Sequence, residues 1–138
     1  MSGVRGTEFG LTVQPNGDTG IGTQEGKVLV TGQGQSVEIP AGYQTLLRLG
    51  RRPQSAQTLS NLPQLRLRWL TQTQAGTVRL AGQIDPINLL FVNAVAYPLD
   101  SQGRFDLLLP TPTSDRSPLT ATVITPLGQQ QRYELAIP

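Results

Sequence analysis

The chain has 138 residues, of which 37% are hydrophobic, 5% aromatic and 14% charged, with a net charge of +2. It is too apolar and too weakly charged for a disordered chain, and long enough for one ordinary domain or two small ones. Its basic residues are spread over both halves, which argues against the concentrated positive surface of a nucleic-acid-binding protein.

The chain contains neither cysteine nor histidine. Their absence excludes disulfides and thiolate metal sites, and it removes the usual general base, most zinc sites and the Ser-His catalytic arrangement. No apolar run reaches the roughly 18 residues of a membrane span, and no signal peptide is visible at Met1. Two explanations stay open: the chain is part of a longer precursor, or it is intracellular.

Residues 1–52 predict a series of short strands joined by tight turns. In the segment 8–14, Phe9, Leu11 and Val13 alternate with polar or small residues, which is the period of a half-buried strand with these three side chains inward. Further strands are expected at residues 19–23, 27–31, 35–39 and 43–49, between turns at Asn16-Gly17, Glu25-Gly26, Gly32-Gln33-Gly34 and Pro40-Ala41-Gly42.

The expected strand at 27–31 has three consecutive apolar residues, Val28, Leu29 and Val30. Such a run predicts a strand that is covered on both faces. No stretch of this half has helical period, and about five short strands in under fifty residues predict an all-β meander.

The same half contains three motifs with glycines in fixed positions. They are Val-Arg-Gly-Thr-Glu-Phe at 4–9, Glu-Gly-Lys-Val at 25–28, and Val-Glu-Ile-Pro-Ala-Gly-Tyr at 37–43. Together they resemble the pattern of the FecR domain family over about residues 3–50, with Tyr43 where the family usually has glutamine. The family-signature residues are Val4, Arg5, Gly6, Thr7, Phe9, Glu25, Gly26, Ala41 and Gly42.

The resemblance implies a periplasmic or extracellular protein of the bacterial envelope, in signalling or scaffolding, with no catalytic residue in the signature. Arg5 and Gly6 are expected to fix backbone geometry at a corner of the meander. The match corresponds to the second half of the family's domain, so we expect a domain that is short at its front. Such a domain would leave an unpaired edge near Phe9, and we predict weak self-association through residues 4–14.

Residues 53–63 change composition, with two prolines and a polar run, and they predict a linker. The densest basic cluster, Arg48, Arg51 and Arg52, lies just before it. A solvated strand end is the favoured interpretation of this cluster, with a possible interaction site as the alternative.

Residues 64–138 predict seven further strands. In the first, Leu67 and Trp69 alternate with Arg66 and Arg68, so the strand is predicted to bury Trp69 on one face and to expose arginines on the other. The others are expected at residues 77–84, 89–92, 95–98, 104–109, 119–125 and 130–137, with a proline-rich loop at 110–118. Seven strands at regular spacing predict an antiparallel β-sandwich.

This half also carries a series of turn motifs: Leu80-Ala81-Gly82, Asp85-Pro86, Phe91-Val92-Asn93, Tyr97-Pro98-Leu99-Asp100 and Gly103-Arg104-Phe105. The series resembles the bacterial Ig-like modules of envelope proteins. The predicted fold is therefore all-β: an antiparallel, meander or sandwich-like FecR-type domain at 1–52, a linker at 53–63, and an Ig-like seven-stranded β-sandwich at 64–138.

Two groups of carboxylates are candidates for a metal site or a catalytic pair. Asp85, Asp100 and Asp106 lack the alternating acidic spacing of a calcium loop, and aspartate is an ordinary choice at turns. Glu8 and Glu25 could face each other as the carboxylate pair of a glycosidase, but turn or ion-pair roles are favoured at strand ends. We predict no catalytic, cofactor or metal residue, and no enzyme.

Two functions remain. The first is a non-enzymatic envelope protein that acts in signalling, as a scaffold or as a protein-interaction module, with the second half as a spacer or further contact. Its expected partner is an envelope protein or, through an exposed strand edge, a second copy. The alternative is a carbohydrate-binding accessory module of an envelope glycan-processing system. That alternative usually needs exposed aromatic side chains, and the sequence has a single Trp, Trp69.

Overall fold

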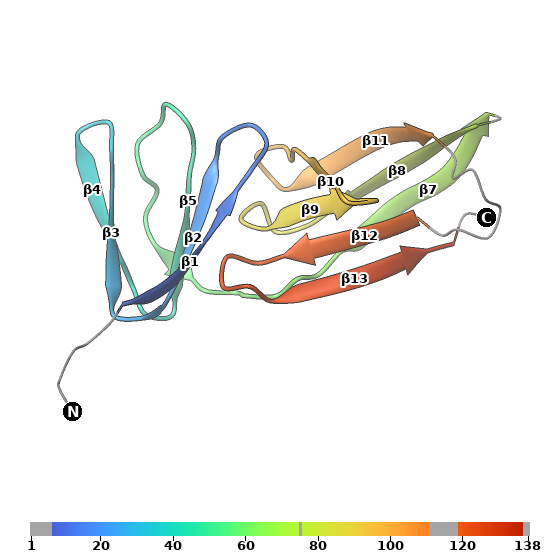
Figure 1. The fold of residues 1–138 in the computed structure, drawn as a ribbon. Coiled ribbons are helices and arrows are strands. Elements are labelled where there is room, and N and C mark those ends of the chain that lie inside the picture. Colours follow the sequence, from blue (N-terminus) through green and yellow to red (C-terminus); the bar gives the residue numbers. More distant parts are fainter. Residues whose placement is uncertain (1–6, 75, 111–118, 137–138) are drawn as a thin grey trace.

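The structure is a computed structural model, and it describes residues 7–74, 76–110 and 119–136. These residues form thirteen β-strands in four antiparallel sheets (Figure 1). The predicted all-β, antiparallel and sandwich-like fold is thereby confirmed. In the ranges described, no helix has the length and apolar character needed to cross a membrane. Most of the predicted loop at 110–118 lies outside the described residues.

The first half of the chain forms two layers. The larger layer is a sheet in the order β1-β2-β5-β6, and the hairpin β3–β4 forms the second layer. Their bounds are β1 Glu8–Val13, β2 Thr19–Glu25, β3 Lys27–Gly32, β4 Gln35–Pro40, β5 Tyr43–Leu47 and β6 Gln57–Thr58. The first five strands match the predicted ones to within about two residues at each end. Strand β6 lies inside the predicted linker and pairs with the start of β5.

The hairpin β3–β4 covers only part of the larger sheet, because β4 packs against β2 and β5 while β1 lies beyond them. The small core that forms between the layers consists of Ile21, Val30 and Ile39. Phe9, Leu11 and Val13 are consequently exposed, with Leu11 at 53%. The prediction that these three side chains point into a core is wrong.

The prediction that β3 is covered on both faces is also wrong. Val30 is buried in the small core, but Leu29 is 64% exposed. Side chains of successive residues in a strand point to opposite faces. In the described part of the chain the hairpin is the outermost layer, so the face that carries Leu29 meets solvent.

The second half is a β-sandwich of seven strands. One sheet has the order β11-β8-β7 and the other β10-β9-β12-β13. The bounds are β7 Arg66–Gln74, β8 Thr77–Gln83, β9 Leu89–Val92, β10 Val95–Tyr97, β11 Arg104–Pro110, β12 Leu119–Ile124 and β13 Gln130–Leu135. Inward side chains of both sheets form one core, with Leu80, Leu90, Leu119 and Val123 almost fully buried. Seven strands were predicted at these positions, and all seven form.

Strand β7 departs from its predicted orientation. Its register against β8 shifts between Leu67 and Trp69, so that Arg68 is an extra residue in the ladder. A bulge of this kind exchanges the faces of the residues on either side of it. Trp69 therefore pairs with Ala81 on the outer face and is 44% exposed, and the prediction that it is buried is wrong.

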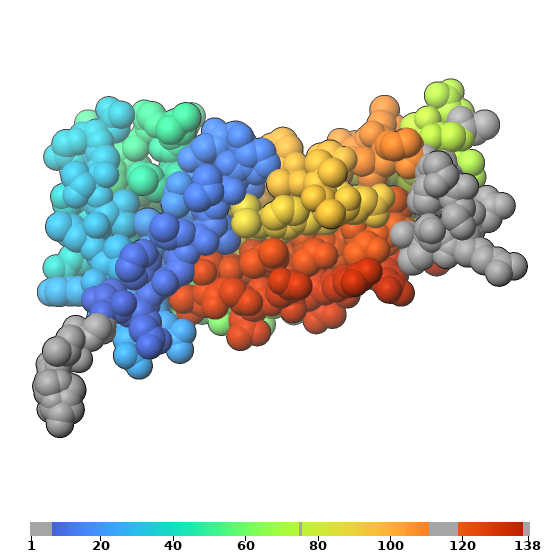
Figure 2. Space-filling view, viewed as in Figure 1, coloured from blue at the N-terminus to red at the C-terminus, as the bar shows by residue number. Residues whose placement is uncertain are grey.

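The two halves meet where β1 and β2 lie against the loops of the second half (Figures 1 and 2). Glycines make this approach possible. A Cβ atom at Gly10 would overlap the carbonyl oxygen of Pro126, and one at Gly20 would lie 2.7 Å from the carbonyl oxygen of Ile87. The sheet can therefore approach these loops only where its side chains are absent.

Buried polar side chains hold the same contact. The hydroxyl of Thr12 donates to the carbonyl oxygen of Ile87 at 2.6 Å, and the amide of Gln14 donates to that of Asn88 at 2.5 Å. The side-chain amide of Asn88 donates in turn to the carbonyl oxygen of Leu62 at 3.0 Å. The polar face of β1 is thus the face that is buried, which leaves its apolar face open.

Candidate functional site

The described residues of the FecR-type signature gather at one corner of the first half. The turn at Gly26 has a φ of 73°, and a Cβ atom there would lie 2.8 Å from the hydroxyl of Thr7. The backbone N–H of Ala41 donates to the carbonyl oxygen of Gly26, and that of Gly42 donates to the carbonyl oxygen of Thr23. These contacts join the turn at Gly26 to Thr7 and to the turn at Ala41 and Gly42. Val4, Arg5 and Gly6 lie outside the described residues.

The remaining described signature residues do not form a catalytic or metal-binding site. Glu25 is opposite Glu8 in the register of β1 and β2, and both are exposed. Phe9 is the first of the exposed apolar side chains of β1. Among the described residues, no group of three or more acidic side chains is placed to hold a metal ion.

Arg48 is used within the protein. Its guanidinium forms an ion pair with Asp18 at 3.6 Å and donates to the carbonyl oxygen of Ser101 at 2.9 Å, so it joins the first half to a loop of the second. Arg51 and Arg52 are exposed beside it. The three arginines considered as an interaction site thus divide into one that is engaged and two that face solvent.

Among the described strands, none pairs with the outer edge of β1, so the strand presents a free edge as well as an open face. The N–H of Gln14 donates to the carbonyl oxygen of Asp18, which marks this pair as hydrogen-bonded across the hairpin. Hydrogen-bonded and non-bonded pairs alternate along an antiparallel ladder. The N–H and C=O groups of Phe9, Leu11 and Val13 are therefore directed away from β2, toward the unpaired edge. Phe9 to Val13 contains no charge and no proline, and β2 pairs with it in unbroken register.

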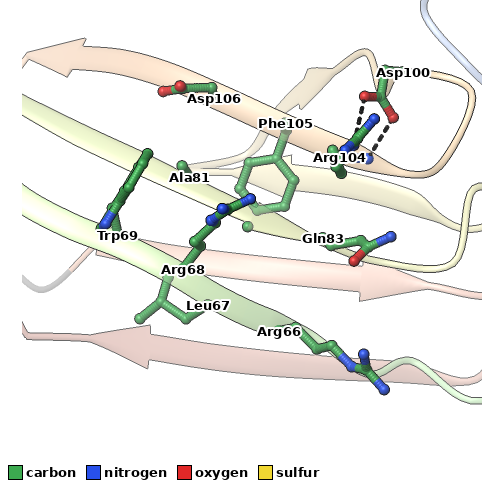
Figure 3. Close-up of a pocket in the computed structure, with 11 residues that line it drawn as sticks. Arg66, Leu67, Arg68, Trp69, Ala81, Gln83, Asp100, Arg104, Phe105 and Asp106 are labelled. Atoms are coloured by element: carbon green, nitrogen blue, oxygen red, sulfur yellow. Dashed lines mark hydrogen bonds and ion pairs between the residues drawn. The ribbon is translucent and has the colours of Figure 1, made fainter.

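A second surface lies on the outer face of β7, β8 and β11. It is a shallow groove of about 550 Å³ (Figure 3). Its lining includes Arg66, Leu67, Arg68, Trp69, Arg104 and Asp106. Strand β7 carries the first four of these residues and β11 the last two, and β8 between them adds Ala81 and Gln83 to the lining.

A row of stacked groups lies around Trp69, at one end of this groove. The guanidinium of Arg79 lies 4.1 Å from the centre of the Trp69 ring, and that of Arg68 lies 5.3 Å from it. Arg79 is opposite Thr71 in the register, so the two guanidinium groups approach the ring from opposite directions along the strand. Asp106 accepts two hydrogen bonds from Arg79, at 3.0 and 2.6 Å. Asp106 therefore fixes Arg79, and the Trp69 ring lies between the guanidinium groups of Arg68 and Arg79.

The carboxylates of the groove are both engaged. Hydrogen bonds from Arg79 hold the pKa of Asp106 below its ordinary value of 3.8. Partial burial raises the pKa of Asp100, but N–H groups of Arg104 and Gln102 outweigh it and leave that pKa lowered. Arg66 and Arg68 form no ion pair with any described residue.

We predict that acid releases Arg79. Because the folded pKa of Asp106 is lowered, the stabilisation from the pair is complete above the ordinary pKa of 3.8 and is lost as pH falls through the lowered value. Trp69 is the single tryptophan, so its fluorescence reports this change. Its emission should be constant above about pH 5 and change only in strong acid.

The matched variants are Asp106→Asn and Glu134→Gln, the latter exposed on β13. Asp106→Asn should show the altered emission already at neutral pH, and Glu134→Gln should titrate as the wild type does. Emission of Asp106→Asn that equals the wild type at every pH would contradict the role given to the pair.

Sequence reasoning missed this groove because the bulge at Arg68 has no local signal. Arg66 and Arg68 were expected on the exposed face, but Trp69 was not expected beside them. Comparison of the chain with protein-family models, with curated proteins and with solved structures found no match. The resemblances to FecR domains and to Ig-like modules consequently remain predictions.

Proposed function

We propose that the protein is a non-enzymatic interaction module of the bacterial cell envelope, acting in signalling or as a scaffold, and that strand β1 is its contact surface. The location in the periplasm or outside the cell rests on the resemblances alone. The observation that carries the proposal is the apolar and uncharged edge from Phe9 to Val13, with which no strand of the described ranges pairs. Edges of this kind recruit a further strand, and natural proteins usually block them.

The partner that fits this edge is a second copy of the chain. A two-fold axis at Leu11 in an antiparallel pairing places Leu11 opposite its own copy and Phe9 opposite Val13. Both pairs point to the same face of the joined sheet, because directly opposed residues share a face. Glu8 then lies opposite Gln14, so like charges are kept apart. About six backbone hydrogen bonds would form between the copies.

Sedimentation velocity tests the pairing. The wild type should show weak, concentration-dependent self-association, and Leu11→Glu should remove it by placing two carboxylates opposite each other. Leu11 is half exposed, so the variant should fold normally. Leu108→Glu makes the same change at an exposed leucine of β11 and should leave the association unchanged. A wild type that stays monomeric at high concentration would overturn this contact.

A separate observation favours a second candidate, a carbohydrate-binding accessory module. Trp69 is exposed in a groove lined by arginine, aspartate and glutamine side chains. Aromatic rings beside fixed polar groups are the usual composition of small-ligand sites. Specific binding on a glycan array that is lost in Trp69→Ala, with the fold retained, would support this candidate.

A further inference from the structure

The groove on β7, β8 and β11 has unbalanced charge. Its two carboxylates, Asp100 and Asp106, are each paired with an arginine of the sheet. Arg66 and Arg68 line the same groove and have no carboxylate partner among the described residues. An anionic ligand would therefore meet two available guanidinium groups and no unpaired carboxylate.

Trp69 and the bulge direct Arg68 toward the groove (Figure 3). A guanidinium stacked beside an aromatic ring keeps its N–H donors in its own plane and free. Those donors match the two oxygens of a carboxylate. On the other side of the ring, Asp106 holds Arg79, and the Arg79 guanidinium packs against the ring and restricts its movement.

The edge of β7 is unsuited to an extended peptide. Peptides that bind sheets gain affinity by pairing their backbone along an edge strand. In β7 the register shifts twice, between Leu67 and Trp69 and between Gln72 and Gln74, and arginines stand on the strand. Bulges and charges of this kind block edge pairing. A ligand without a peptide backbone fits this surface better, and the exposed edge of the Trp69 ring is available to the C–H groups of a sugar ring.

We infer that the groove binds an acidic carbohydrate, with carboxylates of uronic-acid units on Arg68 and Arg66 and a sugar ring against the edge of Trp69. The inference rests on the second candidate function and specifies its ligand class. It is independent of pairing through β1, which lies in the other half of the chain.

The test uses the full chain and an oligogalacturonate, with the carboxyl-reduced oligosaccharide of the same length as matched ligand. Quenching of Trp69, the single tryptophan, reports binding directly. Arg68→Gln and Arg66→Gln should each weaken binding of the acidic probe on the order of tenfold, as expected for one lost charged hydrogen bond. Arg132→Gln removes an exposed arginine from the other sheet and should leave the affinity unchanged.

Each outcome has one meaning. Binding of the acidic probe alone, weakened in both groove variants and not in Arg132→Gln, supports the inference. Equal binding of the carboxyl-reduced probe overturns the acidic ligand class while carbohydrate binding stands. Absence of binding to either probe and to a glycan array overturns both. Equal or tighter binding of poly-glutamate would make the groove a site for acidic peptides and overturn the carbohydrate class. Arg68→Gln and Arg66→Gln each replace an exposed side chain, so a folded variant is expected in both cases.

Discussion

The variant Gln14→Glu is expected to lower the free energy of unfolding by about 3 to 5 kcal/mol at pH 7, the cost of a buried charge without a partner. The amide of Gln14 donates to the carbonyl oxygen of Asn88 at 2.5 Å and is directed at that of Pro86 at 3.4 Å. A carboxylate in its place would face acceptors only and could donate nothing. Its charge would also be buried between the two halves, since Gln14 is 5% exposed.

Acid should restore the stability that the Gln14→Glu variant loses at pH 7. Burial raises the folded-state pKa of the new carboxyl above its unfolded value of about 4.3. The destabilisation is therefore small below that value, because the neutral acid can donate as the amide did. It grows as pH rises toward the folded pKa and is constant above it. Urea unfolding at pH 4 and pH 7, each relative to the wild type at the same pH, measures it.

The matched control is Gln72→Glu, which makes the same chemical change at an exposed position of β7. It should alter the unfolding free energy by no more than about 0.5 kcal/mol at either pH. A Gln14→Glu chain as stable as the wild type at pH 7 would mean that the two halves do not share this buried contact in solution.

Replacing Gly20 with alanine is expected to cost about 3 kcal/mol, the upper range for overfilling a packed site. The new Cβ atom would lie 2.5 Å from Cγ1 of Ile87 and 2.7 Å from its carbonyl oxygen, and it would also overlap the hydroxyl of Thr12. Neither the Ile87 backbone nor Thr12 can move without breaking the hydrogen bond between them. The cost thus comes from lost space between the halves.

Gly32→Ala is the control for Gly20→Ala. A Cβ atom at Gly32 would make ordinary contacts, at 3.5 Å or more, with Leu47 and Pro53. Urea unfolding should place this variant within about 0.5 kcal/mol of the wild type. If both glycine variants lose the same small amount, the close approach of β2 to Ile87 is not a feature of the folded protein.

The sequence was sufficient to predict the strands. Alternating apolar residues and turns such as Asn16-Gly17 act over a few neighbours, so their effect is readable locally. The alternation does not say which face is covered, because that depends on what packs there. In β1 the covered face is the polar one, with Thr12 and Gln14 held by backbone carbonyls seventy or more residues away.

The groove around Trp69 was harder to predict from the sequence, for a related reason. One extra residue in β7, Arg68, moves Trp69 from the core to the outer face, and no turn residue marks the bulge. The partners of Trp69 also come from other strands, Arg79 on β8 and Asp106 on β11. Their assembly depends on sheet register, which the residues around Trp69 do not encode. An unpaired edge near Phe9 was predicted, but the open apolar face of β1 was not.

A single engineered cysteine tests the central proposal most directly, because the chain has none of its own. In the two-fold pairing, position 11 lies opposite its own copy as a hydrogen-bonded pair about 5.5 Å apart, within the range of a disulfide. Under mild oxidation Leu11→Cys should form a disulfide-linked dimer much faster than Leu108→Cys at the same protein concentration. Equal rates for the two variants would contradict pairing of β1 with a second copy.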